Sequence, residues 1–205
     1  MIEQIVLSYA KMMTYLKEVL SLSIFKTGDL LLVRPSDQNF SKLIAASTKQ
    51  LKTNYTHIAL IVQTATSTFC YDASPKHGCR KQTLTVFSQD EDADIDLYRL
   101  KQPIHHPEQL IQRAQACLGA PYNASFSEKH PGYYCSEFVC EVFAPLHCFH
   151  LTPMTFGPNG SILPDWQEYY DQLGLPIPNG EPGSSPNSLV AQGQLRFIKT
   201  LPSVL

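Results

Sequence analysis

The segment Thr56–Val62, THIALIV, constrains the fold of this chain most strongly. All its residues from Ile58 onward are apolar, so a strand formed here would have no face suited to water. Strands of this kind lie inside a sheet that is covered on both faces. A second apolar run, Leu30–Val33, is stopped by Pro35 and suits another buried strand of the same sheet.

The length and the charge favour one compact domain without a nucleic-acid partner. The chain has 205 residues, of which 43% are hydrophobic and 17% charged, so we predict a single domain over 1–205. Sixteen basic residues stand against eighteen acidic ones, and no dense cluster of Lys or Arg is present to follow a phosphate backbone. No apolar run approaches the roughly 18 residues of a transmembrane segment, so we expect no membrane span.

Residues 1–22 predict an amphipathic helix. A secretory signal has basic residues first and then an uncharged core, whereas Glu3, Lys11, Lys17 and Glu18 are spread along this segment. At a helical spacing these charges fall on one side and apolar residues on the other. We interpret the helix as packed on the domain, with binding to a membrane surface or a partner as the alternative. Without a signal of this type we expect a cytoplasmic protein, although another export route stays open.

The six cysteines are interpreted as free thiols, because no export signal and no CxxC pair is present. We expect no metal ion and no cofactor. The residues that might supply zinc ligands match no known spacing; they are His147, Cys148 and His150, with Cys70, His77 and Cys79.

A β-hairpin is expected to follow the apolar strand. The polar stretch QTATST separates it from FCYDA, which resumes a strand pattern. If the turn is centred between Thr64 and Ala65, the antiparallel register places His57 directly opposite Asp72. Directly opposed residues share a face with Cβ atoms roughly 5 Å apart, so the Asp72 carboxylate would reach the imidazole.

Helices and irregular segments dominate the rest of the chain. The helix at 135–143 is the clearest, because Cys135, Phe138, Val139, Val142 and Phe143 follow a helical period that Pro145 ends. The other predicted elements are helices at 41–51, 107–118 and 165–173 (the last capped by Asp165), strands at 96–100 and 194–201, an irregular stretch at 144–165, and a loop at 176–188 within a loop-rich C-terminal segment, 174–205.

Cys135 stands at the first turn of its predicted helix, where the unpaired N–H groups favour a thiolate. A nearby histidine would complete a thiolate–imidazolium pair, and a carboxylate on its other nitrogen would fix the tautomer. His57 and Asp72 meet both requirements, and the backbone N–H of Cys135 would face an oxyanion. Taken singly, each has an ordinary structural interpretation: a core cysteine, a structural histidine, a turn or surface aspartate. Cys117 and Cys140 lie within helices and are interpreted as structural.

The ordered segments GDLLLV, THIALIV, GAPYN and YYCSEFV resemble the landmarks of the permuted NlpC/P60 papain-like superfamily, in particular its YiiX/YebB-like branch of cysteine hydrolases. The resemblance covers roughly 26–143, and more loosely TFG at 155–157 and SPNSL at 185–189. It implies a circularly permuted papain-like fold of the α+β class, with a small antiparallel sheet packed against the nucleophile helix.

The resemblance also implies roles for particular residues. Cys135 matches the nucleophile and His57 the general base, while Asp72 stands where the family usually has a Glu, fifteen positions after the histidine. Tyr122 corresponds to a tyrosine beside the thiolate that helps to bind the oxyanion, and we add Tyr134 as a second candidate for oxyanion or substrate binding. Because Asp is shorter than Glu, the carboxylate of Asp72 must reach the same imidazole with a shorter side chain. The orienting role of Asp72 is therefore the point at which this sequence departs from the family.

The expected function is a cysteine hydrolase that cleaves amide or ester bonds through an acyl-enzyme on Cys135. Its partner would be a small peptide-like substrate, including peptidoglycan-type peptides, or an acylated one. The nearest alternative is a lipid acyltransferase or phospholipase like the lecithin:retinol acyltransferase relatives. An alternative of another class is a binding module that has kept the fold and lost the activity.

Overall fold

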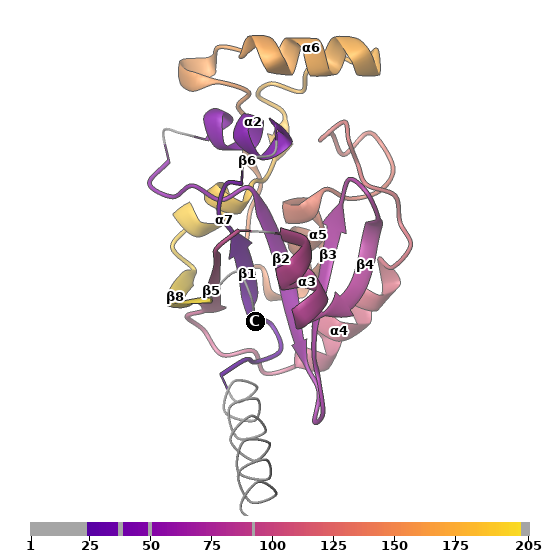
Figure 1. The fold of residues 1–205 in the computed structure, drawn as a ribbon, viewed down its shortest axis with the longest axis vertical. Coiled ribbons are helices and arrows are strands. Elements are labelled where there is room, and N and C mark those ends of the chain that lie inside the picture. The colour runs from indigo at the N-terminus through magenta and orange to yellow at the C-terminus, as the bar shows by residue number, and fades with distance from the viewer. Residues whose placement is uncertain (1–23, 37–38, 49–50, 92, 202–205) are drawn as a thin grey trace, which may run out of the picture.

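The computed structural model describes residues 24–36, 39–48, 51–91 and 93–201, and the predicted helix at 1–22 lies outside them. Its centre is a six-stranded antiparallel sheet with the order β4-β3-β2-β1-β5-β8 (Figure 1). The strands are β1 Leu30–Val33, β2 His57–Gln63, β3 Thr68–Ser74, β4 Gly78–Thr83, β5 Ile95–Leu100 and β8 Leu195–Leu201.

Helices surround this sheet. They are α2 Asn39–Ser47, α3 Leu84–Glu91, α4 Pro107–Ala116, α5 Cys135–Phe143, α6 Pro164–Leu173 and α7 Pro186–Ala191, with 3₁₀ turns at Ala144–Leu146 and Pro158–Gly160. Two short strands, β6 Thr152–Pro153 and β7 Pro182–Gly183, pair apart from the main sheet. None of the helices in the described part of the chain has both the length and the apolar character to cross a bilayer.

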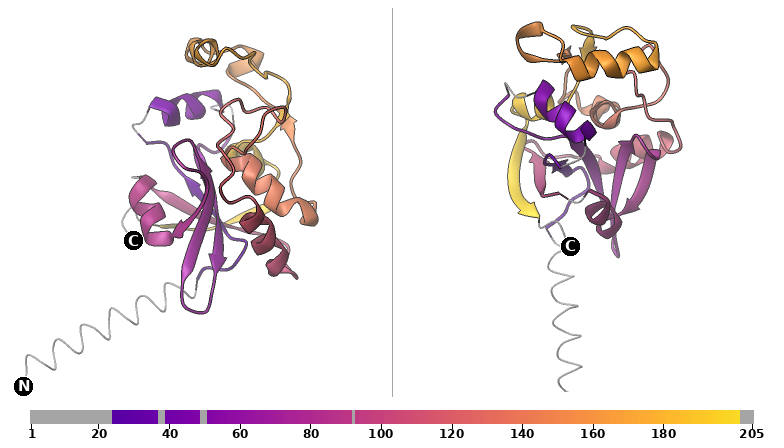
Figure 2. Two further views of the ribbon diagram at one scale, coloured as in Figure 1. Left: turned by 90° about the vertical axis from the view of Figure 1, so that its right-hand side faces the viewer. Right: turned by 45° about the horizontal axis from the view of Figure 1, so that its top comes forward.

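Both faces of the sheet are covered, as the apolar strands predicted. On one face the side chains of Ile58 and Leu60 join a buried cluster with Phe138 and Val139 of α5. On the other face Ala59 and Ile61 pack in a cluster that contains Phe87 of α3. The left view of Figure 2 shows α3 on one side of the strands and α4 and α5 on the other. The α+β fold with a sheet packed against the cysteine helix is therefore confirmed.

The strongest sequence patterns located their elements closely. β1 and α5 have the predicted bounds, β5 and β8 differ from prediction by one residue at one end, and β2 is shifted by one residue at both ends. The helix predicted at 41–51 lies at 39–47, and α6 begins at Pro164 with Leu163 rather than Asp165 at its N-cap. The predicted loop at 176–188 is wrong in part, because it contains β7 and the start of α7.

The register predicted for the β2–β3 hairpin is wrong by two residues. The structure pairs Leu60 with Tyr71 and Gln63 with Thr68, so the turn is centred one position later than expected. The reason is a hydrogen-bonded loop, in which the backbone N–H and the hydroxyl of Thr64 both donate to the carbonyl oxygen of Ser67. A shift of two residues keeps every side chain on its face, so Asp72 becomes a diagonal neighbour of His57.

Two further elements, β4 and α3, were not predicted from the sequence. The sequence of β4, GCRKQT, has the charged and polar composition of a strand at the edge of a sheet. The helix α3, LTVFSQDE, buries only Phe87 and Ser88, so its apolar period is weak. A local signal was nevertheless present, since the hydroxyl of Thr83 accepts from the backbone N–H of Val86 and caps this helix.

A buried asparagine of α7 holds the chain that leads into β2. The side-chain oxygen of Asn187 accepts from the backbone N–H of Tyr55, and its nitrogen donates to the carbonyl oxygen of Tyr55 and to the hydroxyl of Thr48. All three bonds are 2.8 Å long, and Asn187 is fully buried. Because Tyr55 lies two residues before His57, this clamp fixes the start of the strand that carries the histidine.

We predict that Asn187→Ala lowers the free energy of unfolding by about 2–4 kcal/mol, because buried polar groups lose their partners. Urea unfolding followed by tryptophan fluorescence measures the change. Asn179→Ala is the matched control, since the side chain of Asn179 makes an exposed bond of 3.4 Å to Gly160. Equal stabilities of the two variants would contradict the clamp.

Candidate active site

The start of α5 is fixed by its own first turn. Tyr134 has an extended backbone and is the N-cap, and Glu137 accepts a hydrogen bond from the backbone N–H of Tyr134. The same Glu137 oxygen accepts from the side-chain nitrogen of Asn123 at 3.2 Å. Through these two accepted hydrogen bonds the Glu137 side chain fixes the end of the helix that carries Cys135.

The loop before α5 lies against the helix start through close backbone contacts. Tyr122 and Tyr133 form an isolated parallel bridge, and the backbone N–H of Tyr133 donates to the carbonyl oxygen of Pro121. Gly132 has φ +95°, and a Cβ atom at this position would lie 2.2 Å from that carbonyl oxygen. Only glycine permits this approach, which brings Tyr122 beside Cys135.

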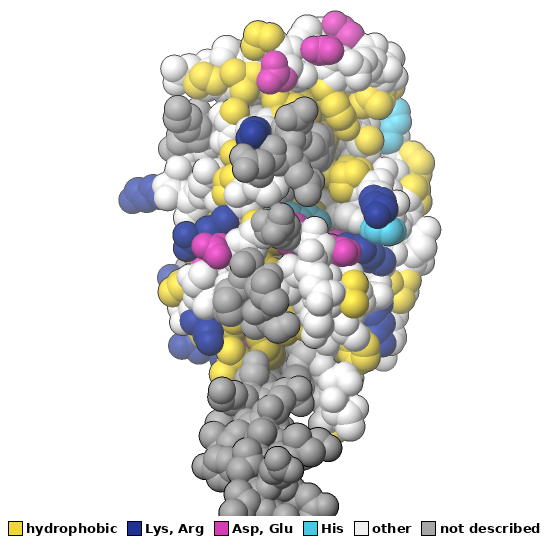
Figure 3. All heavy atoms as spheres, in the orientation of Figure 1, with side chains coloured by type: hydrophobic (Ala, Val, Ile, Leu, Met, Phe, Trp, Pro, Cys, Tyr) yellow, Lys and Arg dark blue, Asp and Glu magenta, His cyan; other side chains and the backbone are white. Residues whose placement is uncertain are grey.

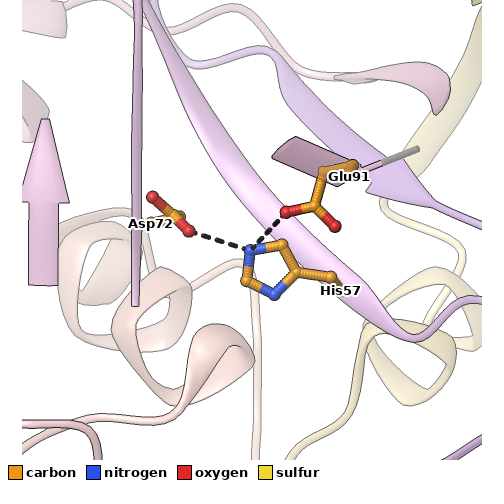
Figure 4. A group of neighbouring side chains, drawn as sticks. All are labelled: His57, Asp72 and Glu91. Atoms are coloured by element: carbon orange, nitrogen blue, oxygen red, sulfur yellow. Dashed lines mark hydrogen bonds and ion pairs between the residues drawn. The ribbon is translucent and has the colours of Figure 1, made fainter. Parts of the chain in front are cut away.

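His57 and Asp72 are in contact, as predicted, although through a different register. The Nε2–H of His57 donates to Oδ2 of Asp72 at 3.0 Å, so the aspartate reaches the ring despite its shorter side chain. This bond leaves Nδ1 of the ring for the thiol of Cys135. Figure 4 shows Nε2 turned toward the carboxylates and the other nitrogen turned away.

Asp72 is fully buried, and both of its carboxylate oxygens accept hydrogen bonds. Its Oδ1 accepts from Nε of Arg80 at 3.1 Å and from the side-chain nitrogen of Gln82 at 3.3 Å. Burial opposes ionisation of this carboxyl, but His57 and Arg80 outweigh it and lower the pKa of Asp72. The aspartate is therefore an ionised acceptor for the N–H of the imidazole.

Glu91 is a member of the site that the sequence did not reveal. Its Oε1 lies 3.9 Å from Nε2 of His57 (Figure 4). Burial opposes the imidazolium, but Glu91, Asp72 and Cys135 together raise the pKa of His57 well above its usual value. Glu91 could not be found from the sequence, because α3, the helix that carries it, was not predicted.

Cys135 lies where two cavities meet. Tyr122, Thr56 and Ile44 line both cavities together with it. The first has a volume of about 470 Å³ and is mainly apolar, with Leu51, Phe126, Met154, Phe156 and Trp166 among its lining residues. The second has a volume of about 610 Å³ and is lined by charged groups, including Arg34, Lys76, Arg80, Asp90 and Glu91. Figure 3 shows histidine and acidic side chains in the middle of one face of the molecule, with basic side chains on both sides.

The two tyrosines of the prediction differ in their surroundings. Burial raises the pKa of Tyr122, and the charge of Cys135 raises it further, so the phenol stays protonated beside the thiol. The hydroxyl of Tyr134 accepts from the backbone N–H of Ser184 at 3.1 Å and lines the apolar cavity. The structure thus brings Tyr122 to the junction of the cavities and Tyr134 to the wall of one.

The other thiols lie in different surroundings. Cys70, Cys79 and Cys117 are buried, and burial raises the pKa of all three, that of Cys79 to about 12. Burial also raises the pKa of Cys140 and of Cys148 to about 11.

One group of side chains has the spacing of metal ligands within the described part of the chain. Ligand atoms of His57, Asp72 and Glu91 all lie within 4.8 Å of one another, and an imidazole with two carboxylates suits a divalent cation. Such a cation would take the nitrogen through which His57 donates to Asp72. The residues considered from the sequence, around Cys70, His77 and Cys148, form no such group among the described side chains.

The strand that carries His57 precedes the helix that carries Cys135 in the chain, and this helix packs against the antiparallel sheet. This order of elements is that of a papain-like fold in permuted form. The comparisons with known proteins give the family. Residues 24–199 match the family described as permuted papain-like amidase, YaeF/YiiX, C92, and the chain belongs to this family.

A solved structure shows the same fold. It is described as metalloprotein yiiX from Escherichia coli O157:H7, with a TM-score of 0.71 and 22% sequence identity. The match covers 85% of this chain and 96% of the Escherichia coli chain. No curated protein sequence matches the chain.

The environment of Glu137 predicts a pH-dependent stability. Burial raises the pKa of Glu137 to about 7, from 4.5 for a free side chain. Between these values the folded protein holds a proton that the unfolded chain has lost, so stability falls as the pH rises. We predict that Glu137→Gln removes this fall, so that between pH 4.5 and 7 the variant gains of the order of 1 kcal/mol on the wild type.

Urea unfolding at several pH values measures this difference. Glu168→Gln, at an exposed position of α6, is the matched control and should follow the wild type. If the free energy of unfolding changed with pH in the same way for Glu137→Gln and the wild type, the prediction would be contradicted.

Proposed function

We propose that this protein is a cysteine hydrolase that cleaves an amide or ester bond through an acyl-enzyme on Cys135. The observation that supports this most directly is the bond from Nε2 of His57 to Asp72, which leaves Nδ1 free for the thiol. The family of permuted papain-like amidases supports the same class of reaction.

The proposed first step forms a thioester. Nδ1 of His57 takes the proton of the thiol, and the sulfur attacks the carbonyl carbon of the substrate. The negative charge that develops on the carbonyl oxygen is stabilised by the backbone N–H of Cys135 and by the hydroxyl of Tyr122. When the bond to the amine or alcohol breaks, the imidazolium gives its proton to the leaving group.

The proposed second step returns the enzyme to its starting state. His57 accepts a proton from water, the hydroxide oxygen attacks the thioester carbonyl, and the carbon–sulfur bond breaks. A carboxylic acid leaves, and the sulfur regains its proton from the imidazolium. Asp72 keeps the ring in one orientation through both steps, because its bond to Nε2 persists in either charge state of the ring.

The apolar cavity supports an acylated substrate over a polar peptide. Among its lining residues within the described chain, none is Asp, Glu, Lys or Arg. A charged peptide side chain would lose its hydration there without a partner, whereas an alkyl chain would gain about 0.8 kcal/mol for each buried methylene. We therefore place the acyl group in this cavity and the leaving group in the charged one.

The reactivity of the cysteines tests the nucleophile. We predict that iodoacetamide at neutral pH labels Cys135 far faster than the other five thiols, and that His57→Ala slows this labelling. Cys135→Ala should reduce kcat/KM by at least about 10³-fold. Peptide mapping by mass spectrometry gives the rate at each thiol.

Two controls sharpen this experiment. Cys140→Ala, in the same helix, should leave both labelling of Cys135 and hydrolysis unchanged. A chelator should not reduce hydrolysis, which separates the proposed reaction from one that depends on a metal, as the description of the Escherichia coli structure would suggest. Slow and uniform labelling of all six thiols would favour the binding module.

The length of the acyl chain tests the substrate class. With fluorogenic amides and esters of straight-chain acids, we predict that kcat/KM rises by up to about fourfold for each added methylene until the cavity is filled. Ala191→Phe, which narrows the cavity, should shorten the preferred chain, while Ala46→Phe on the exposed side of α2 should not.

The same assay separates the alternatives. Higher kcat/KM for charged peptides than for acyl amides would contradict an acylated substrate. Transfer of the acyl group to an added alcohol or amine, in preference to water, would favour the acyltransferase.

A further inference from the structure

Phe126 has a backbone conformation that a bulky residue adopts only where its surroundings impose it. Its φ is +55°, in the left-handed region that favours glycine. Strain of this kind is concentrated at binding and catalytic sites. Phe126 lines the apolar cavity beside Cys135 and does not line the charged one. We propose that Phe126 is a specificity-determining residue, a rigid wall of the apolar cavity that excludes acyl groups branched next to the carbonyl carbon.

Hydrogen bonds hold the backbone on both sides of Phe126. The side-chain oxygen of Asn123 accepts from the backbone N–H of Ser125 at 3.2 Å, and its nitrogen donates to the carbonyl oxygen of Ser127 at 3.0 Å. The backbone N–H of Phe126 donates to the carbonyl oxygen of Asn123 at 3.3 Å. Asn123 is buried, so water does not compete for these bonds, and the strained turn is maintained.

Two tyrosine hydroxyls of α6 fix the same loop. Tyr169 donates to the carbonyl oxygen of Ala124, and Tyr170 donates to that of Ser125, each at 2.8 Å. These two carbonyl groups directly precede Phe126 in the chain. The point at which the phenyl ring is attached is therefore held by a helix as well as by the loop itself.

The ring of Phe126 is also surrounded by other aromatic rings. Tyr134 directly precedes Cys135, and Tyr122 lines both cavities together with it. The contacts with these two rings place Phe126 at the end of the apolar cavity that adjoins Cys135. The four neighbouring rings and the distances of their centroids from that of Phe126 are Tyr134 (5.2 Å), Trp166 (5.7 Å), Tyr122 (6.2 Å) and Tyr169 (6.4 Å).

A fixed ring in this place selects an acyl group by its shape. A flexible side chain would move aside for an additional methyl group, whereas a ring held by its backbone and by four neighbours moves only at a cost in packing. A straight acyl chain passes along the ring, and a branch on the carbon next to the carbonyl meets it. This inference rests on the proposed function in one respect, the assignment of the acyl group to this cavity.

The experiment compares Phe126→Ala with Met154→Ala in the full-length protein. Met154 lines the same cavity, but its long unbranched side chain adapts to a ligand. Both variants are made in the Cys135→Ala background, so that binding is measured without turnover. Binding of octanamide and of its α-methyl derivative is followed by the fluorescence of Trp166, which is the single tryptophan of the chain and lines the cavity.

The ratio of the two dissociation constants is the quantity that decides. With Phe126 present, we expect the α-methyl amide to bind at least about tenfold more weakly than octanamide. Phe126→Ala should reduce this ratio to less than about threefold, whereas Met154→Ala should weaken both amides alike and leave the ratio unchanged. A ratio in Phe126→Ala equal to that of the parent protein would overturn the inference.

Phe126→Gly provides a second variant without the ring and without the strain. Glycine adopts a φ of +55° freely, so Phe126→Gly should unfold at a higher urea concentration than Phe126→Ala. The amide ratio should be reduced in both variants, and Phe126→Gly decides the role of the ring if Phe126→Ala does not fold. A lower urea midpoint for Phe126→Gly would contradict a strained backbone at this position.

The outcome is separable from that of the proposed function, because binding to the Cys135→Ala protein requires no reaction. If Cys135→Ala retained full hydrolysis, the acyl-enzyme would be wrong, while the amide ratio would still decide the role of Phe126. If Cys135→Ala were inactive and Phe126→Ala did not change the ratio, only the role of Phe126 would be wrong. With Cys135 intact, the kcat/KM values for fluorogenic amides of the same two acids should change in the same order.

Discussion

The hydrogen bond from Nε2 of His57 to Asp72 is the interaction on which the rest of this site depends. It decides which ring nitrogen faces away from the carboxylates, and hence which one is available to Cys135. The bond joins two neighbouring strands, so it exists only in a hairpin register that keeps both residues on one face. That register in turn needs β2 at the interior of the sheet, with α3 covering one face and α5 the other.

The sequence predicted those parts of the fold in which apolar residues repeat strongly. β1 and α5 were located to the residue, because four apolar residues before Pro35 and a helical period ended by Pro145 allow few alternatives. The hairpin register was not determined in this way. Apolar alternation has a period of two, so a shift of two residues leaves the pattern unchanged, and only the hydrogen bonds of Thr64 with Ser67 decide the register.

The polar members of the site were harder to find for a different reason. Glu91 and Arg80 belong to a short helix and an edge strand that contain few buried apolar residues, so neither element has a strong apolar pattern. Asn187 lies in a segment rich in Pro, Ser and Gly that was interpreted as a loop, yet it is fully buried because three hydrogen bonds satisfy its amide. Such groups are placed by tertiary contacts, which a single sequence does not display.

The position of Cys135 follows from the way in which its helix, α5, packs in the core. The apolar face of α5, with Phe138, Val139 and Val142, is fixed in the core, so the helix cannot turn or slide. Its first turn must then stand where the core ends, and there an apolar cavity and a charged cavity meet. Cys135, the nucleophile of the proposed reaction, therefore lies between two environments of opposite character. For the proposed hydrolase, that arrangement favours a substrate whose acyl group and leaving group differ in polarity, because each half would meet a matching surface while the carbonyl carbon between them would meet the sulfur.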